Sequence, residues 1–276
     1  MAKTVFVLLD GCNYQTATDN LGYLEHLTET GAAAKCRVRG ELPSSSRPMY
    51  ETLLTGLPVL GHGIASNLAV RLSRCENIFS LCRKSGLSTA AAAYCWVSEL
   101  YVRAPFNHRT DRFLNDTDCV IQHGMFYFED NYPDSHVLAD AFHLLQRYDP
   151  DFLMIHTMNI DDAGHAFTSA SPQYAKAAAK ADILLSLFVP DLMEAGYNIA
   201  ITSDHGMNQF GLHGGNTDEQ RETALYLLSR SARRGDFTKN AIPQLCVAPL
   251  LCACLNIERA PGMRSLQELE VTFFEG

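Results

Sequence analysis

Residues 4–9 read TVFVLL, a run of strand-forming and apolar side chains that ends at the carboxylate of Asp10. Two later stretches have the same character, DFLMIHTM at 151–158 and NIAITS at 198–203. A long alanine-rich segment at 173–194 lies between these two and has the pattern of a helix. Alternating strands and helices predict an α/β fold, a three-layer sandwich with a largely parallel central sheet flanked by helices.

The composition supports a full hydrophobic core. The chain has 276 residues, of which 47% are hydrophobic and 19% are charged, and this excludes disordered and fibrous proteins. No linker or internal repeat interrupts it, so we predict one domain over residues 1–276. In residues 101–134 the hydrophobic side chains do not recur at the spacing of a helix or a strand, and this segment is predicted to be an inserted lid or substrate loop. A surface insertion with one hairpin is the alternative.

Charge and cysteine content restrict the class of partner and the compartment. The chain has 22 Lys and Arg against 31 Asp and Glu, a net charge of −9, which argues against a nucleic-acid-binding surface. No apolar stretch reaches the roughly 18–20 residues of a membrane span, and we expect no signal peptide. The nine cysteines are odd in number and predict reduced thiols in a cytoplasmic protein. The sequence carries no signal for an oligomeric state.

Acidic residues follow each of the three predicted strands. Asp10 ends the first, Asp161 comes soon after the second, and Asp204 with His205 ends the third. Ligands of open α/β sheets bind outside the carboxyl ends of the strands, so we expect these side chains to form a site. A single aspartate in such a place often only caps the next helix. Three strand ends of this kind, with histidines nearby, indicate more than capping.

Two further histidines complete the candidate cluster. The stretch DDAGH places Asp161 and His165 on one helical face or around one turn, where they could share a metal ion such as Zn²⁺. A solvated Asp–His pair is the alternative. The stretch FGLHGG at 210–215 adds His213, shortly after the SDHGM that contains Asp204 and His205. Together these spacings predict a metal site.

Three serines precede a predicted helix at 48–56, in the stretch PSSSRPMYETLLTG. A serine in this place brings its hydroxyl to the helix N-terminus, where the macrodipole and free N–H groups favour an anion. An ordinary N-cap serine is the alternative. Coordination to a metal would lower the pKa of the hydroxyl and make it a nucleophile near neutral pH.

The ordered set of motifs resembles the alkaline phosphatase superfamily, and within it the nucleotide pyrophosphatase/phosphodiesterases. The resemblance runs through VFVLLDG, the serine stretch, TGLPVLGHGIASN, DDAGH and SDHGM. It implies a metal-dependent hydrolase of phosphate esters, acting on a small anionic phosphoester or phosphonate. A phosphomonoesterase or a phosphonate hydrolase on the same core is one alternative. A non-catalytic, metal-stabilised binding module is another.

Carried over by position, the resemblance implies a single catalytic domain with two divalent metal ions, zinc first and Mn or Fe as alternatives. Ser46 would be the nucleophile and would form a phosphoserine, with Ser44 and Ser45 as alternatives. The implied ligands are Asp10, Ser46, Asp204 and His205 for the first ion, and Asp161, His165 and His213 for the second.

Three more residues are implied to touch the substrate. Asn67 falls where the phosphodiesterase branch has an asparagine that hydrogen-bonds a phosphoryl oxygen. Arg47 and His156 stand where nucleotide-cleaving relatives have the two aromatic residues that grip the base, so we do not expect nucleotide specificity. Arg47 could instead pair with a second anionic group. The alternatives are a surface salt bridge for Arg47 and a satisfied core histidine for His156.

Overall fold

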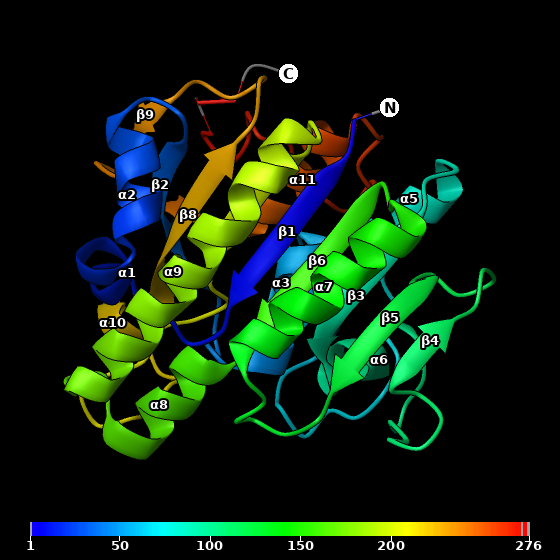
Figure 1. Cartoon of the computed structure of the whole chain (residues 1–276), viewed down its shortest axis with the longest axis horizontal. Coiled ribbons are helices and arrows are strands. Elements are labelled where there is room, and N and C mark those ends of the chain that lie inside the picture. The colour runs from blue at the N-terminus through cyan, green and yellow to red at the C-terminus, as the bar shows by residue number, and fades with distance from the viewer. Residues whose placement is uncertain (1, 272, 275–276) are drawn as a thin grey trace.

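A computed structural model describes residues 2–271 and 273–274 of the chain. In this part of the chain a ten-stranded sheet forms the middle layer (Figure 1). Strand β9 (Gly235–Asp236) pairs with β2 at one side of the sheet. In sheet order, the other strands are β10 (Ile242–Pro243), β2 (Ala34–Arg39), β8 (Glu222–Leu228), β7 (Asn198–Thr202), β1 (Thr4–Leu9), β6 (Phe152–Thr157), β3 (Thr89–Tyr94), β5 (His123–Tyr127) and β4 (Phe113–Asn115).

The sheet is mixed, so the predicted α/β fold is confirmed and the largely parallel sheet only in part. The central strand β1 is parallel to both β6 and β7, and β3 is parallel to β6 and β5. Strand β8 is antiparallel to β2 and β7, and β4 is antiparallel to β5. Parallel neighbours need a long crossover connection, whereas β4 and β5 are joined by the short loop 116–122.

The central strands send alternate side chains into two separate hydrophobic layers. In β1, Val5, Val7 and Leu9 belong to one buried cluster, whereas Phe6 and Leu8 belong to the other. This period of two is the one expected for a strand buried on both faces. The central sheet is therefore covered on both sides, as predicted for a three-layer sandwich.

Helices cover both faces of the sheet, and α7 and α9 lie in front of it in Figure 1. The predicted helix at 173–194 is confirmed as α9. The helices that pack on the face of Val5 and Val7 are α1 (Tyr14–Asn20), α2 (Gly22–Glu29), α7 (Asp134–Tyr148) and α9 (Pro172–Glu194). Those on the opposite face are α3 (Ser46–Thr55), α5 (Ile78–Lys84), α6 (Cys95–Tyr101) and α11 (Val247–Leu255). The remaining elements are α4 (Val59–His62), α8 (Asn159–Phe167), α10 (Asp218–Arg221) and the 3₁₀ turn η1 (Gln244–Cys246).

Residues 101–134 contain the hairpin of β4 and β5, which extends the central sheet at one edge. This matches the hairpin alternative for the segment. Because β5 is parallel to β3, its end at Tyr127 lies at the same edge of the sheet as the ends of β1 and β6. A lid role for the flanking loops stays a prediction. Within the described residues, no helix combines the length and the apolar character needed to cross a membrane.

Candidate metal centre

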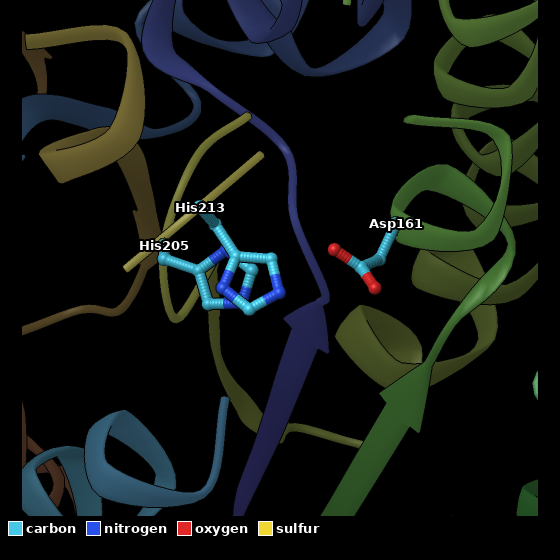
Figure 2. Close-up of side chains that lie close together, drawn as sticks. All are labelled: Asp161, His205 and His213. Atoms are coloured by element: carbon cyan, nitrogen blue, oxygen red, sulfur yellow. The ribbon is translucent and has the colours of Figure 1, made fainter. Parts of the chain in front are cut away.

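The loops that follow three adjacent strands bring the predicted ligands together. Asp10 comes directly after β1, and Asp204 and His205 come two and three residues after β7. Asp161 lies in α8, which begins two residues after β6. Figure 2 shows Asp161 pointing toward the rings of His205 and His213, beside the end of β1. The ligand-binding edge predicted from the sequence is thus the carboxyl edge of β6, β1 and β7.

The donor atoms form two groups that share His205. In one group, the donor atoms of Asp10, Asp204 and His205 lie within 4.8 Å of one another. In the other, those of Asp161, His205 and His213 do so. The His205 Nε2 atom lies 3.2 Å from Asp204 Oδ2 and 3.5 Å from Asp10 Oδ1. The two groups mark two adjacent places for a cation, and His205, with one free ring nitrogen, could serve one of them.

His165 joins this cluster from α8, where it lies four residues after Asp161. Its Nε2 atom is 3.3 Å from Asp161 Oδ2, and its ring centroid is 5.0 Å from that of His213. The prediction that Asp161 and His165 share one helical face is confirmed by α8. Asp161 is only 6% exposed, whereas the His165 side chain is 45% exposed, so solvent reaches the histidine of this pair but hardly the carboxylate.

Backbone carbonyls set the tautomers of two histidines. The Nδ1 atom of His205 lies 3.0 Å from the carbonyl oxygen of Gly206, and that of His165 lies 3.1 Å from the carbonyl oxygen of Gly211. A carbonyl oxygen only accepts, so Nδ1 carries the proton in each ring and Nε2 has a free lone pair. The lone pair of His165 therefore faces the Asp161 carboxylate, and this contact is favourable only with a proton or a cation between them.

Several buried donor atoms of the cluster lack a partner. Among the residues that the structure describes, no hydrogen bond reaches Asp10 Oδ1, Asp161 Oδ1, Asp204 Oδ2 or His213 Nδ1. A buried polar atom without a partner is destabilising, and coordinated cations, one at each group, would satisfy all four. Carboxylate oxygen and imidazole nitrogen are ligands of Zn²⁺, and they also suit Mn²⁺ and Fe. The residues therefore fit divalent metal ions.

Burial and mutual repulsion shift the ionisation of the cluster. Burial raises the pKa of Asp10 well above its usual range, and the charges of Asp204 and Asp161 raise it further. Burial, followed by the charge of Asp161, raises the pKa of Asp204 to about 7. Burial lowers the pKa of His213 to about 4. A bound cation would favour ionised carboxylates and neutral imidazoles, which are the states that ligands need.

Ser46 is the serine that meets the cluster. It is the first residue of α3, and its Oγ lies 3.1 Å from His205 Nε2. Because that nitrogen is an acceptor, the Ser46 hydroxyl donates to it. Ser45 is the N-cap but makes no side-chain capping bond, and the Ser44 hydroxyl donates to the carbonyl of Gly215. The N-cap alternative thus applies to the position of Ser45 and not to Ser46.

Arg47 is the second residue of α3, and Asn67 reaches it from the loop between α4 and α5. The Asn67 Oδ1 atom accepts a hydrogen bond of 3.0 Å from the backbone N–H of Arg47. The Arg47 side chain turns toward α6, where Nη2 lies 2.7 Å from Glu99 Oε2 and the guanidinium lies 4.6 Å from the Trp96 ring centroid. Arg47 is only 1% exposed, so its ion pair with Glu99 is buried and differs in this from the surface salt bridge that was the alternative to a substrate contact.

His156 contacts Asp10 from the neighbouring strand β6. It is fully buried in β6, with Nε2 2.9 Å from Asp10 Oδ2 and Nδ1 3.0 Å from the Tyr127 hydroxyl. This arrangement matches the alternative given from the sequence, a core histidine whose two ring nitrogens both have hydrogen-bond partners. Tyr50 was not among the predicted site residues, although its hydroxyl donates to the same Asp10 oxygen. In α3 it lies four residues after Ser46 and so on the same face, but the helix predicted at 48–56 began after Ser46 and did not include that spacing.

Comparisons with known proteins agree with the motifs. The chain matches the family model of type I phosphodiesterase / nucleotide pyrophosphatase over residues 4–231. It is 24% identical to the catalytic subunit of human GPI ethanolamine phosphate transferase 2 over 281 residues, which cover 93% of this chain and 26% of that protein. It is 26% identical to the human GPI ethanolamine phosphate transferase 3 catalytic subunit over 146 residues, 52% of this chain and 13% of that protein. The chain thus spans about a quarter or less of the length of these curated relatives.

Two solved structures share the fold. Murine ectonucleotide pyrophosphatase/phosphodiesterase 5, an inactive variant in complex with AMP, superposes with a TM-score of 0.76 at 15% identity, covering 98% of this chain and 100% of that one. A phosphonate monoester hydrolase from Silicibacter pomeroyi superposes with a TM-score of 0.67 at 14% identity, covering 97% and 76%. The family match spans most of the chain, and the chain belongs to the type I phosphodiesterase / nucleotide pyrophosphatase family of the alkaline phosphatase superfamily.

Proposed function

We propose that this chain is a metal-dependent hydrolase of phosphate esters, of the phosphodiesterase/pyrophosphatase type, that acts through a phosphoserine on Ser46. The observation that carries the proposal is the contact of Ser46 Oγ with His205 Nε2, at 3.1 Å. His205 belongs to both groups of candidate ligands, so the hydroxyl lies against the cluster that would hold the cations. Membership of the family supports the class of reaction.

Two divalent cations are part of this proposal, zinc first, with Mn or Fe as alternatives. When bound, they would attract the anionic phosphate, offset the buried carboxylates and lower the pKa of the Ser46 hydroxyl. The residues proposed to hold them are Asp10, Ser46, Asp204 and His205 for the first, and Asp161, His165 and His213 for the second.

The proposed reaction has two balanced steps. The Ser46 oxygen forms a bond to phosphorus while the bond from phosphorus to the leaving alcohol breaks in line, and the alcohol takes up the proton that Ser46 loses. A water molecule then attacks phosphorus from the opposite side, and Ser46 leaves and regains a proton. The sum is one diester and one water converted into one monoester and one alcohol.

Asn67 and the N-terminus of α3 would hold the phosphoryl group. The Asn67 amide uses Oδ1 to accept from the Arg47 N–H, and this leaves its Nδ2 group to donate to a non-bridging oxygen. In the first turn of α3, Arg47 donates its N–H to Asn67 and Pro48 has none, so the helix would offer the Ser46 N–H and the positive end of its dipole. Donors fixed in this way stabilise charge as it develops on phosphorus.

Arg47 is proposed to recognise a second anionic group of the substrate. Its Nε and Nη1 atoms are buried and have no hydrogen-bond partner in the described part of the chain, which supports this role. The ion pair with Glu99 opposes it, because the guanidinium already has one carboxylate partner. His156 contacts Asp10, so any influence on the substrate passes through that carboxylate.

The substrate class is a small anionic phosphoester. The curated relatives are named as ethanolamine phosphate transferases, which supports a phosphodiester with an ethanolamine group as one candidate. Hydrolysis of a phosphomonoester or a phosphonate is the alternative on the same core. A non-catalytic binding module would hold metal without turnover. The stacking residues for a nucleobase are replaced by Arg47 and His156, so a nucleotide is not the first candidate.

The test combines elemental analysis of the purified protein with a substrate panel. The panel holds an aryl phosphodiester, an ethanolamine phosphodiester, a phosphomonoester, a phosphonate monoester and phosphonoacetate. We expect two metal equivalents and the fastest turnover on a diester. Faster turnover of the monoester would contradict the phosphodiesterase assignment, and two bound metals without turnover would favour the binding module.

Arg47→Lys should raise KM more for substrates with a second anionic group.

A serine pair tests the nucleophile. Ser46→Ala should abolish covalent phosphorylation and reduce kcat by several orders of magnitude, because it removes the serine hydroxyl that contacts His205. Ser45→Ala is the matched control, since Ser45 is adjacent and makes no capping bond. It should stay phosphorylated and active. Phosphate retained on Ser46→Ala, detected by mass spectrometry, would move the nucleophile to a neighbouring serine.

Three broader proposals accompany the activity. We propose one catalytic domain over 1–276, with the loops of 101–134 as substrate determinants. The Tyr94 hydroxyl at the end of β3 lies 2.8 Å from Asp130 Oδ1, which supports a place for these loops beside the site. We also propose a cytoplasmic location, which the nine free cysteines support. Detection of a tagged form of the protein in the cytoplasmic fraction of lysed cells would test it.

A further inference from the structure

The two oxygens of the Asp10 carboxylate have different surroundings. Oδ2 accepts from the Tyr50 hydroxyl and lies 2.9 Å from His156 Nε2. Oδ1 lies 3.5 Å from His205 Nε2 and has no hydrogen-bond partner in residues 2–271 and 273–274. One oxygen is thus held by the protein, while the other faces the metal cluster.

The tautomer of His156 follows from its neighbours. The backbone N–H of Tyr94 points at His156 Nδ1 over 3.4 Å, and the Tyr127 hydroxyl lies 3.0 Å from the same nitrogen. A backbone N–H can only donate, so Nδ1 must be an acceptor without a proton. The proton of the neutral ring is therefore on Nε2, and it is donated to Asp10 Oδ2.

This support comes from four separate elements. His156 is in β6, Tyr94 ends β3, Tyr127 ends β5 and Tyr50 is in α3. None of these side chains is more than 8% exposed, and Asp10 itself is fully buried. Water therefore cannot readily replace a lost donor, and rotation of the carboxylate would leave buried polar groups without partners.

We propose that His156 and Tyr50 are positioning residues for Asp10, which hold Oδ2 so that Oδ1 is presented to the first cation. The inference rests on the proposed metal centre and adds two residues to it that do not themselves bind metal. Residues that orient a metal ligand in this way typically change metal affinity by about 10- to 100-fold.

The experiment measures the two Zn²⁺ dissociation constants by competition with a chromophoric chelator. His156→Leu removes the donor and should weaken one of the two constants by about 10- to 100-fold, leaving the other within a few-fold. His156→Gln should restore much of the affinity, because its amide can donate to the same oxygen. Tyr50→Phe should weaken the same constant as His156→Leu.

His62 supplies the matched control. It is a buried histidine with both ring nitrogens in contact, to Thr52 and to the backbone of Ile64, and it lies outside the cluster. His62→Leu should lower the midpoint of thermal unfolding and leave both Zn²⁺ constants unchanged. Should His156→Leu fail to fold, Tyr50→Phe and His156→Gln test the same oxygen.

The outcomes separate this inference from the proposed function. Zn²⁺ constants in His156→Leu and Tyr50→Phe equal to those of the unmodified protein would overturn the positioning role and leave the metal centre intact. A loss of Zn²⁺ affinity in His62→Leu as large as that in His156→Leu would also overturn the positioning role, because it would show that any disruption of the core weakens metal binding. An unmodified protein that binds no divalent cation would overturn both proposals.

Discussion

Gly11 determines how closely the turn after β1 approaches α8. Its φ of +71° lies in the left-handed region. A Cβ added there would lie 2.5 Å from Asp161 Oδ1 and 2.8 Å from Asp161 Cα. The second contact is to backbone, so α8 would have to move and Asp161 with it. The absence of a side chain at this position lets Asp10 and Asp161 belong to one cluster.

We expect Gly11→Ala to lower the free energy of unfolding by about 3 kcal/mol or more, since strain at a positive φ alone costs of order 1–3 kcal/mol. It should also weaken Zn²⁺ binding. Urea unfolding and zinc titration measure the two effects. Gly86→Ala is the control, because Gly86 has a φ of +75° but open space around its Cβ position. It should show only the smaller loss and normal zinc affinity; equal losses would contradict a clash with α8.

At the scale of elements, helix α8 depends on α7 for its beginning. The N-cap of α8, Met158, makes no side-chain capping bond. Instead Asp134, at the start of α7, uses Oδ1 to accept from the backbone N–H groups of Met158 at 3.3 Å and Asn159 at 3.2 Å. Asn159 accepts in return from the Asp134 N–H. This reciprocal contact fixes the helix that carries Asp161.

The carboxyl group of Asp134 should make stability depend on pH. Burial raises its pKa from 3.8 to about 6. The stability that this group contributes is full below about pH 4 and is lost as the pH rises through about 6. Asp134→Asn keeps the Oδ1 acceptor but cannot ionise. Urea unfolding measures the free energy of unfolding of both proteins. We expect the value for Asp134→Asn, relative to that of the unmodified protein, to increase by up to about 3 kcal/mol as the pH rises from 4 to 8.

Exposed Asp118 provides the comparison for this measurement. Asp118→Asn should shift the free energy of unfolding by only a small amount, because this side chain lies on the surface. A difference between Asp134→Asn and the unmodified protein that stays constant from pH 4 to pH 8 would mean that Asp134 ionises normally in the folded chain.

In the whole molecule, folding brings three carboxylates of like charge to one buried edge of the sheet. Asp10 and Asp204 are fully buried, and Asp161 is nearly so. Burial, reinforced by their mutual repulsion, raises the pKa of Asp10 and of Asp204. Without a cation this edge therefore opposes folding, although the hydrophobic layers on both faces of the sheet favour it. Metal binding and global stability are expected to be linked.

Removal of metal should lower the thermal unfolding midpoint, and excess zinc should raise it. A cation that binds only the folded state at one hundred times its Kd adds about 2.7 kcal/mol per site. Calorimetry in chelator and in zinc measures the shift. His213→Leu removes a ligand proposed for the second ion only, so it should retain about half of the zinc-dependent gain. A midpoint that does not respond to zinc would contradict the linkage.

The sequence by itself determined which strands end in carboxylates, the helical spacing of Asp161 and His165, and the order of motifs that indicated the family. Periodicity and neighbouring residue types are local properties, so they can be recognised without coordinates. The same local signal predicted the three-layer α/β architecture, and it could not indicate that β8 runs antiparallel between β2 and β7.

The tertiary structure decided which distant residues meet. The sheet order places β6 and β7 on either side of β1, and this brings Asp161 and Asp204 to Asp10. It also turned Arg47 toward Glu99, which is 52 residues away, and His156 toward Asp10, which is 146 residues away. Strand pairing and the direction of a buried side chain depend on contacts across the whole fold. No spacing within one segment encodes them.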